Sequence, residues 1–297
     1  MIKDTFSDKI FKVCNYIFLT IALLIVLYPI IFIVSASISN PRFVNSGEMW
    51  LWPKGFNIEG YKMVFENKSI WNGYKNTIIY TLVGTAINLF VTIPGAYALS
   101  RKDLVGRGFM MAILVITMFI SGGLIPSYLL IKNLGMINTI WALVIPGAAS
   151  VYNVIVCRTF FQTSIPGELA ESAKIDGASN FTLFTKIVVP LSAPIIAVMG
   201  LFYGVGHWNS YFGAMIYLKD QDLYPLQLVL RQILVLQEMS GEMTMNSATA
   251  ELMEHQATVA DTVKYAVIII ATLPLVVIYP FMQRFFVKGV MIGSVKG

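Results

Sequence analysis

The residue types that usually carry catalytic or metal chemistry are sparse in this sequence. The 297 residues include two histidines, His207 and His255, and two cysteines, Cys14 and Cys157, and their spacing matches no zinc-binding pattern. No G-x-x-x-x-G-K-[S/T] segment occurs, so the phosphates of a nucleotide would have to be bound by another chain. Nothing resembles a nucleophile elbow. We therefore expect no enzyme activity, no metal site and no cofactor bound by this chain.

The most informative polar residues lie together in segment 164–181. Glu168 stands where the first turn of a helix would place a carboxylate at the positive end of the helix dipole. Gly177 tolerates the left-handed turn that ends a helix, and Ser179 or Asn180 can cap a second helix. The segment therefore predicts a short helix, a sharp turn and another helix.

The helical spacing of the first of these helices indicates which side chains share a face. Leu169, Ser172, Ala173 and Asp176 fall on one side, and most of them are small enough to let another surface approach the backbone closely. Because this helix is too polar for lipid, it is typical of a docking element for a soluble partner. A plain solvated connector is the alternative that these properties leave open.

Long apolar blocks of sequence lie on both sides of segment 164–181 and must hold it in place. Hydrophobic residues make up 57% of the chain and charged residues 12%, whereas soluble domains carry about 25% charged residues. Six blocks are long enough to cross about 30 Å of hydrocarbon. They lie at 13–36, 75–100, 108–132, 140–162, 183–214 and 262–287. The first block is longer than the apolar region of a cleaved signal, so we expect a retained span. Gly122, Gly123 and Pro126 predict a bend or an end in the third.

The distribution of basic residues predicts how the spans are oriented. If the N-terminus is cytoplasmic, the inner segments carry an excess of Lys and Arg, as the positive-inside rule requires. The net charge of +5 is dispersed between apolar blocks, which favours contact with lipid and disfavours nucleic acid. Segment 164–181 then lies inside and 215–261 forms an outer loop. The predicted fold is all-α: one transmembrane domain over 1–297, with six spans and cytoplasmic N- and C-termini.

The inner segment resembles the "EAA" loop of ABC importer permeases, whose pattern is E-A-A-x-x-x-G followed by I-x-L-P. The matching residues are Glu171, Ser172, Ala173, Gly177, Ile187, Pro190 and Leu191. Ser172 replaces the usual first Ala, and Val189 replaces the usual Leu. The fuller string from Glu168 to Ser179 is similar to that of maltose-type carbohydrate permeases. Further similarity to the branch that serves complex oligosaccharides lies in Trp208-Asn209, Tyr224-Pro225-Leu226 and Lys288 to Ser294.

This resemblance implies a fold, a mechanism and a set of partners. The fold would be that of a type I ABC importer permease in a bacterial cytoplasmic membrane. The partners would be a second, similar permease, two cytosolic ATPases that use ATP and Mg, and an extracytoplasmic solute-binding protein. An oligosaccharide would be imported by alternating access. The C-terminal tail from Gly293 to Gly297 would contact the ATPases, as would the coupling helix. The coupling positions are Glu168, Glu171, Ser172, Ala173, Asp176 and Gly177.

Polar residues inside spans are costly and are therefore candidates for the substrate path. Trp208, Asn209 and Tyr211 cluster in the fifth block, where aromatic rings can stack on sugars and the amide can hydrogen-bond hydroxyl groups. An aromatic belt at the membrane interface is the alternative. Asn88 and Asn153 are also candidates, although hydrogen bonds between helices explain them equally well. His207 alone is more typical of a satisfied packing residue.

The outer loop 215–261 contains a further predicted helix. Leu226, Val229, Leu230, Ile233 and Leu234 have helical spacing, which predicts an amphipathic helix. Residues 239–256 match the family least, and a contact with the binding protein is a hypothesis for this loop.

Two alternative functions are compatible with the sequence. A permease for a non-sugar solute, such as a peptide, stays open because the coupling loop is shared across substrates. An ion-coupled secondary transporter is the more distant alternative.

Overall fold

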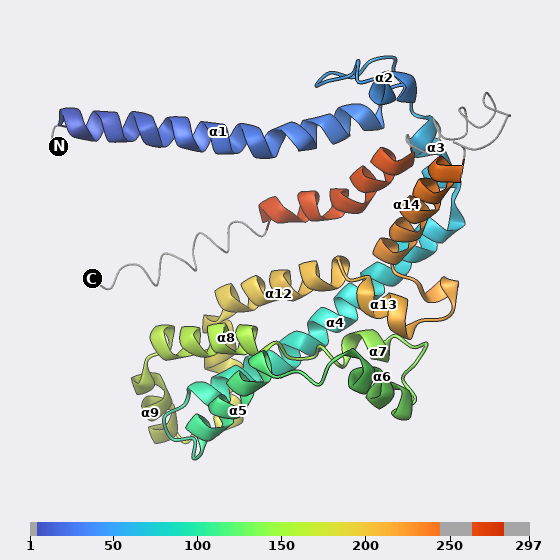
Figure 1. Ribbon diagram of the computed structural model, residues 1–297. Helices are drawn as coiled ribbons and strands as arrows, with labels where there is room; N and C mark the ends of the chain where they lie inside the picture. Colours follow the sequence, from blue (N-terminus) through green and yellow to red (C-terminus); the bar gives the residue numbers. More distant parts are fainter. Residues whose placement is uncertain (1–4, 244–262, 282–297) are drawn as a thin grey trace. The chain divides into compact units, whose positions relative to one another are not determined.

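The computed structural model describes residues 5–243 and 263–281, and most of these residues are helical (Figure 1). The chain divides into two compact units. The first comprises residues 1–68 and 230–273, and the second comprises residues 69–229 and 274–297. Within the described ranges, β-type pairing is limited to one isolated antiparallel bridge between Ser39 and Phe56. The predicted all-α class is confirmed.

The first unit begins with α1 (Phe6–Ser37), which a capping box between Thr5 and Asp8 starts. Every residue from Phe6 to Ile31 is exposed, although most of them are apolar. An exposed apolar helix of this length is what contact with lipid or with another subunit requires. The unit continues through α2 (Pro41–Asn45) and α3 (Glu59–Glu66).

The loop that follows α1 is tied back to the end of that helix. Ser35 Oγ donates to the carbonyl of Leu51, and Tyr61 Oη donates to Ser37 Oγ over 2.8 Å. The amide of Asn57 donates to the carbonyl of Ile38 over 3.0 Å. These bonds hold residues 38–61 as an ordered connection.

The second unit contains the long helix α4 and a series of shorter helices. In chain order these are α4 (Lys68–Ser100), α5 (Arg107–Phe119), α6 (Leu124–Asn133), α7 (Trp141–Val144), α8 (Val151–Ser164), α9 (Gly167–Ile175) and α10 (Asn180–Leu183). A π-helical turn (Phe184–Val188), α11 (Val189–Leu191), α12 (Ala193–Trp208), α13 (Phe212–Tyr217) and a 3-10 turn (Gln221–Leu223) follow. The last helix of this series, α14 (Leu226–Met243), begins in the second unit and belongs to the first unit from Leu230 onwards.

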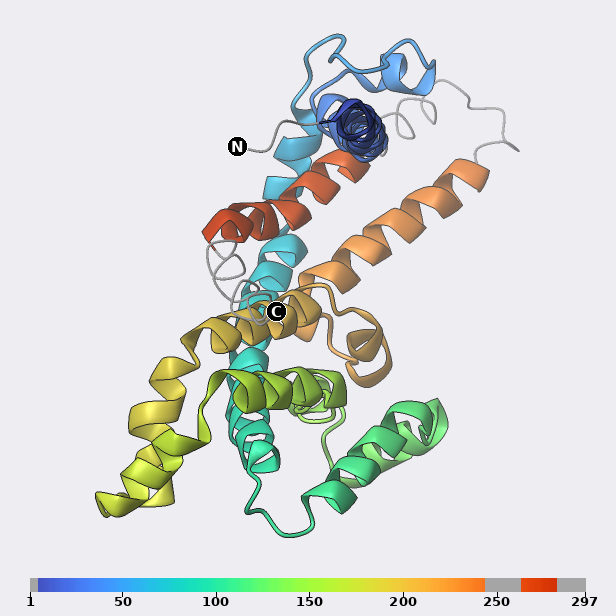
Figure 2. The same ribbon diagram turned by 90° about the vertical axis from the view of Figure 1, so that its left-hand side faces the viewer.

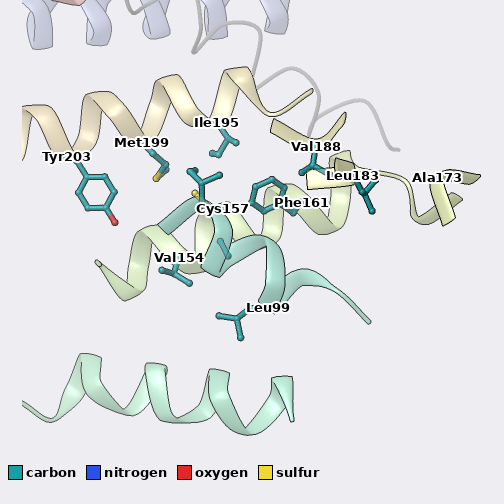
Figure 3. Packing of buried hydrophobic residues seen from close by; sticks show 12 residues of the cluster. Leu99, Val154, Cys157, Phe161, Ala173, Leu183, Val188, Ile195, Met199 and Tyr203 are labelled. Carbon is teal, nitrogen blue, oxygen red and sulfur yellow. The ribbon is translucent and has the colours of Figure 1, made fainter. Parts of the chain in front are cut away.

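The core of the second unit lies where α4, α8 and α12 meet. Side chains of Leu99, Val154, Cys157, Phe161 and Met199 converge there (Figure 3), and Cys157 and Met199 are fully buried. The π-helical turn adds Val188 to the same cluster, and α9 adds Ala173. Shared burial therefore joins the predicted inner segment to the spans on both sides of it.

The predicted spans correspond to helices, but several are not continuous. The first two blocks lie within α1 and α4, and the helix Val263–Phe281 covers the described part of the sixth. The third block divides into α5 and α6, which meet at 114°. This is the bend that the Gly122, Gly123 and Pro126 signal predicts.

Two blocks differ from one continuous helix. The block at 140–162 is interrupted, because α7 ends at Val144 and α8 begins at Val151, with Pro146 and Gly147 between them. The block at 183–214 bends by 77° at the break between α11 and α12 and ends at Trp208. Figure 2 shows this change of direction in the yellow part of the chain. Proline lacks an amide hydrogen, so Pro190 and Pro194 weaken the helix on either side of the break.

Within the described residues, three helices are long and apolar enough to cross a membrane, or five if each bent pair counts as one span. The count of six spans therefore stays a prediction. In the outer loop, the predicted helix is present as α14, with Leu226, Val229 and Leu230 buried and Ile233 and Leu234 half-buried. Residues 244–256 and the C-terminal residues from Lys288 to Gly297 lie outside the described part of the chain.

Candidate functional site

The predicted helix, turn and helix are present in segment 164–181. Helix α9 starts after Pro166, carries Glu168 in its first turn and ends at Asp176. Ser179 caps α10 by accepting a hydrogen bond from the amide of Thr182 over 3.1 Å. The sequence left Ser179 and Asn180 as alternative caps, and the structure selects Ser179.

Gly177 makes the turn between the two helices possible. Its φ is 75°, a left-handed conformation that side chains other than glycine adopt at a cost. Its amide donates to the carbonyl of Lys174, and the amide of Ala178 donates to the carbonyl of Ala173 over 2.8 Å. A Cβ at Gly177 would meet no atom within 4 Å, so the backbone conformation is what requires glycine here.

The structure divides the predicted docking face of α9 into buried and exposed side chains. Ala173 is buried against its own chain, and Leu169 is half-buried, whereas Ser172 and Asp176 are exposed. Of the six coupling candidates, Ala173 is therefore the one that is not accessible to a partner in this conformation. Helical spacing groups side chains but does not say which of them pack inward.

The accessible face of α9 consists of Glu168, Glu171, Ser172 and Ile175. These residues are spaced i, i+3, i+4 and i+7, so they line one side of the helix. Ile175 is 86% exposed and was not among the predicted residues. Its spacing from Glu168 and Glu171 was the signal that could have identified it. An apolar side chain flanked by carboxylates is well suited to a protein partner.

The polar residues within the spans form two cross-links between α4 and α12. Asn88 Oδ1 lies 2.7 Å from His207 Nε2. One turn later on α4 and one turn earlier on α12, Thr92 Oγ1 lies 2.7 Å from Tyr203 Oη. Asn88 and Thr92 are fully buried. We call these two contacts the polar rungs. Asn88 therefore has the helix-to-helix bond that was its alternative explanation, and His207 is a satisfied packing residue.

The same rungs also hold the break between α7 and α8. Asn88 Nδ2 donates to the carbonyl of Gly147 over 2.6 Å, and the amide of Ser150 donates to Tyr203 Oη over 3.1 Å. Non-helical backbone at membrane depth needs partners of this kind, because lipid supplies none. The rungs thus fasten α4, α12 and the interrupted span to one another.

The other candidates for the substrate path are not brought together on one surface. Trp208 is buried in edge-on contact with Tyr74, and Asn153 is also buried. Asn209 and Tyr211 are exposed, and Asn209 Nδ2 donates to the carbonyl of Val205. Asn209 and Tyr211 are therefore the two substrate-path candidates whose side chains are not covered by their own chain.

Three features together define a multi-pass membrane protein of the transporter class. Long helices expose apolar side chains, interrupted spans have hydrogen-bonded backbone at their breaks, and a polar helix presents an accessible face. The chain belongs to the family described as "binding-protein-dependent transport system inner membrane component", whose model matches residues 1–292. Its members are membrane components of transport systems rather than ATPases or enzymes.

Individual relatives match over almost the whole chain. A Bacillus subtilis protein named "Polygalacturonan/rhamnogalacturonan transport system permease protein YtcP" is 40% identical, with 98% of this chain and 100% of that protein covered. "Protein LplC" of the same species is 39% identical, with 99% and 97% covered. A chain from the crystal structure of a bacterial ABC transporter that imports the acidic polysaccharide alginate is 32% identical, with a TM-score of 0.84 and coverage of 96% and 100%. The fold is thus that of an ABC importer permease.

Proposed function

We propose that this chain is one of two permease subunits of an ATP-driven importer and that its substrate is an oligosaccharide. The chain would cross the membrane six times with both termini in the cytoplasm. A second permease, two cytosolic ATPases that use ATP and Mg, and an extracytoplasmic solute-binding protein would complete the transporter. The solute would pass by alternating access between the two membrane faces. The observation that carries this proposal is the accessible face of α9 in a chain of this family.

The choice of an oligosaccharide rests on the relatives. The names of YtcP and of the structural neighbour refer to polygalacturonan, rhamnogalacturonan and alginate. Similarity that covers nearly all of each chain supports a substrate of the same broad class. The exposed Asn209 and Tyr211 supply hydrogen-bonding and aromatic groups of the kind that bind sugars. Both belong to the substrate path in this proposal, whereas Trp208, Asn88 and Asn153 support it from buried positions.

The coupling role is assigned to particular residues of α9. Glu168, Glu171, Ser172 and Ile175 would enter a cleft of the ATPase, and Asp176 would flank them. Gly177 would set the direction in which the helix leaves its turn, and Ala173 would fix the helix to its own chain. Closure of the two ATPases would then move α9 and, through it, α8 and α12.

The test is the composition of the complex purified in mild detergent. The wild-type chain should retain an ATPase with a phosphate-binding loop and a second permease. Gly177→Pro should lose the ATPase, because proline holds φ near −65° and cannot form this turn. Gly167→Pro is the matched control, since Gly167 is the first residue of α9, where proline is tolerated. A wild-type chain that retains no ATPase would refute the proposal.

A further inference from the structure

The coupling segment contacts the end of α4, a helix that is distant from it in sequence. The ring of Tyr97 on α4 lies 5.2 Å from that of Phe184 and 5.6 Å from that of Phe161, measured between centroids. Phe184 begins the π-helical turn that follows α10. Figure 1 shows α9 at the same end of the second unit as the last turn of α4.

Arg101, which directly follows α4, makes the polar part of this contact. Its Nε donates to Asp103 Oδ1 over 2.7 Å, its Nη2 donates to the other carboxylate oxygen, and its Nη1 donates to Asn180 Oδ1 over 3.2 Å. The side chain of Arg101 is only 18% exposed. One guanidinium group therefore joins the end of α4, the loop after it and the first residue of α10.

The side chains of Arg101 and Asn180 are not used to cap the ends of their own helices. At the end of α4, Arg158 Nε donates to the carbonyl of Leu99, and Arg107 Nη1 donates to the carbonyl of Arg101. Other arginines thus satisfy these terminal carbonyls. On the other side, Ser179 caps α10, which leaves the amide oxygen of Asn180 as an acceptor.

Asp103 extends the contact to α9 itself. Lys174 Nζ lies 3.8 Å from Asp103 Oδ2, and both side chains are more than half exposed. A single exposed ion pair of this kind contributes little to stability, so Lys174 is an accessory to the contact. The hydrogen bonds from Arg101 lower the pKa of Asp103 to about 2, and the charge of Lys174 adds a smaller effect in the same direction. Asp103 therefore stays ionised at neutral pH.

We infer that Arg101 is a positioning residue that ties the coupling segment to α4 through Asp103 and Asn180. It transmits movement of α9 to α4, a span that is not a sequence neighbour of the coupling segment. The polar rungs then pass this movement to α12 and to the break before α8. The inference rests on the proposed function, because that function supplies the ATPase that moves α9.

The test uses the whole transporter, purified with its partners and reconstituted into vesicles. Transport of solute and hydrolysis of ATP are measured together, and their ratio is compared between variants. Arg101→Ala should keep the ATPase bound and active, while the ratio falls about tenfold or more, because the change removes the charge-assisted hydrogen bonds to both Asp103 and Asn180. Arg107→Ala is the control, because Arg107 contacts the end of α4 and is not bonded to Asn180.

Conservative changes at Asn180 separate the polar contact from packing. Asn180→Asp keeps an acceptor for Arg101 and should retain the wild-type ratio. Asn180→Leu has a similar volume without an acceptor and should lower the ratio, because it removes the bond from Arg101. The double variant should be no worse than Arg101→Ala alone, since that change already removes the bond to Asn180.

Three results would overturn the inference. The ratio could stay at the wild-type value in Arg101→Ala, the Leu and Asp variants of Asn180 could behave alike, or Arg101→Ala could lose the ATPase. The last result would show that Arg101 supports docking rather than transmission. Failure of the proposed function has a different signature, because the wild-type complex would then contain no ATPase.

Discussion

At the scale of single residues, Gly84 on α4 is the described glycine at which an added Cβ would meet another side chain most closely. A Cβ placed there would lie 2.5 Å from Cε1 and 2.8 Å from Cδ2 of His207. Gly84→Ala must therefore displace the imidazole ring and break the rung to Asn88. Overpacking and a lost hydrogen bond together should destabilise the protein by about 2–4 kcal/mol.

The chain contains its own reporter for this measurement. Cys157 is buried and Cys14 is exposed, so in a Cys14→Ala background a thiol-reactive dye reports unfolding on heating in detergent. Gly95→Ala is the matched control, because it lies on the same helix and its Cβ would meet no atom within 4 Å. The control should be neutral or slightly stabilising. Equal midpoints for both variants would contradict the packing of His207 against Gly84.

Mutation of Trp208 should change the stability of the protein, whereas mutation of its neighbour Asn209 should change transport. Trp208 is 6% exposed, so Trp208→Ala should lower the free energy of unfolding by about 3–5 kcal/mol. Asn209→Ala should leave the unfolding midpoint nearly unchanged and raise the solute concentration needed for half-maximal transport. The same thermal assay and an uptake titration provide the two readouts. A stable Asn209→Ala protein with wild-type uptake would remove Asn209 from the path.

Local features of single residues could be predicted from the sequence, whereas contacts between distant helices could not. Gly177 and Ser179 were predictable because a turn and a cap are local properties of the chain. The pairing of Asn88 with His207 joins residues 119 positions apart, and it depends on how two helices cross. The burial of Ala173 depends in the same way on partners from other helices. Exposure of Ile175 follows once Ala173 is known to face inward.

At the scale of elements, the contact between α4 and the coupling segment should not depend on pH in the physiological range. The folded-state pKa of Asp103 is about 2, below the value of about 3.9 in an unfolded chain. Its contribution is therefore complete above about pH 4 and is lost only as pH falls through about 2. Arg101 stays charged throughout, since its hydrogen bonds to Asp103 raise its pKa.

The constant charge of Asp103 should be visible in reconstituted transport. The ratio of transport to hydrolysis in wild-type protein, divided by that in Asp103→Asn, should be constant between pH 5.5 and 8. A ratio that changes within this interval would mean that Asp103 titrates there, against the contacts seen in the structure. The division by the variant removes the pH dependence of the ATPase and of the binding protein.

The elements also show why the spans were predicted better than their shapes. Hydropathy locates apolar blocks, and it found α1, α4 and the helix Val263–Phe281. It cannot distinguish a straight helix from a bent one of the same composition. The break between α7 and α8 is stable because Asn88 and Tyr203 satisfy its backbone, and those partners come from other parts of the chain. Pro146 and Gly147 lie in this break, but hydropathy does not say that the span opens there.

At the scale of the whole molecule, the orientation in the membrane determines which surface meets which partner. The positive-inside distribution predicts that α9 lies in the cytoplasm and that the loop after α1 lies outside. Two exposed positions can report on this: Ile175 on α9 is 86% exposed, and Trp52 in that loop is 82% exposed. A cysteine at either position should react readily with a maleimide, provided that the reagent reaches that side of the membrane.

The experiment labels intact cells with a membrane-impermeant maleimide, in a Cys14→Ala/Cys157→Ala background. Trp52→Cys should react in intact cells, whereas Ile175→Cys should react only after permeabilisation. Uptake by both variants checks that the labelled chains are assembled. Labelling of Ile175→Cys from outside would place α9 away from any cytosolic ATPase. The coupling role of Glu168 and Glu171, and the transmission through Arg101, would then both be lost, because each requires that α9 face the compartment where ATP is hydrolysed.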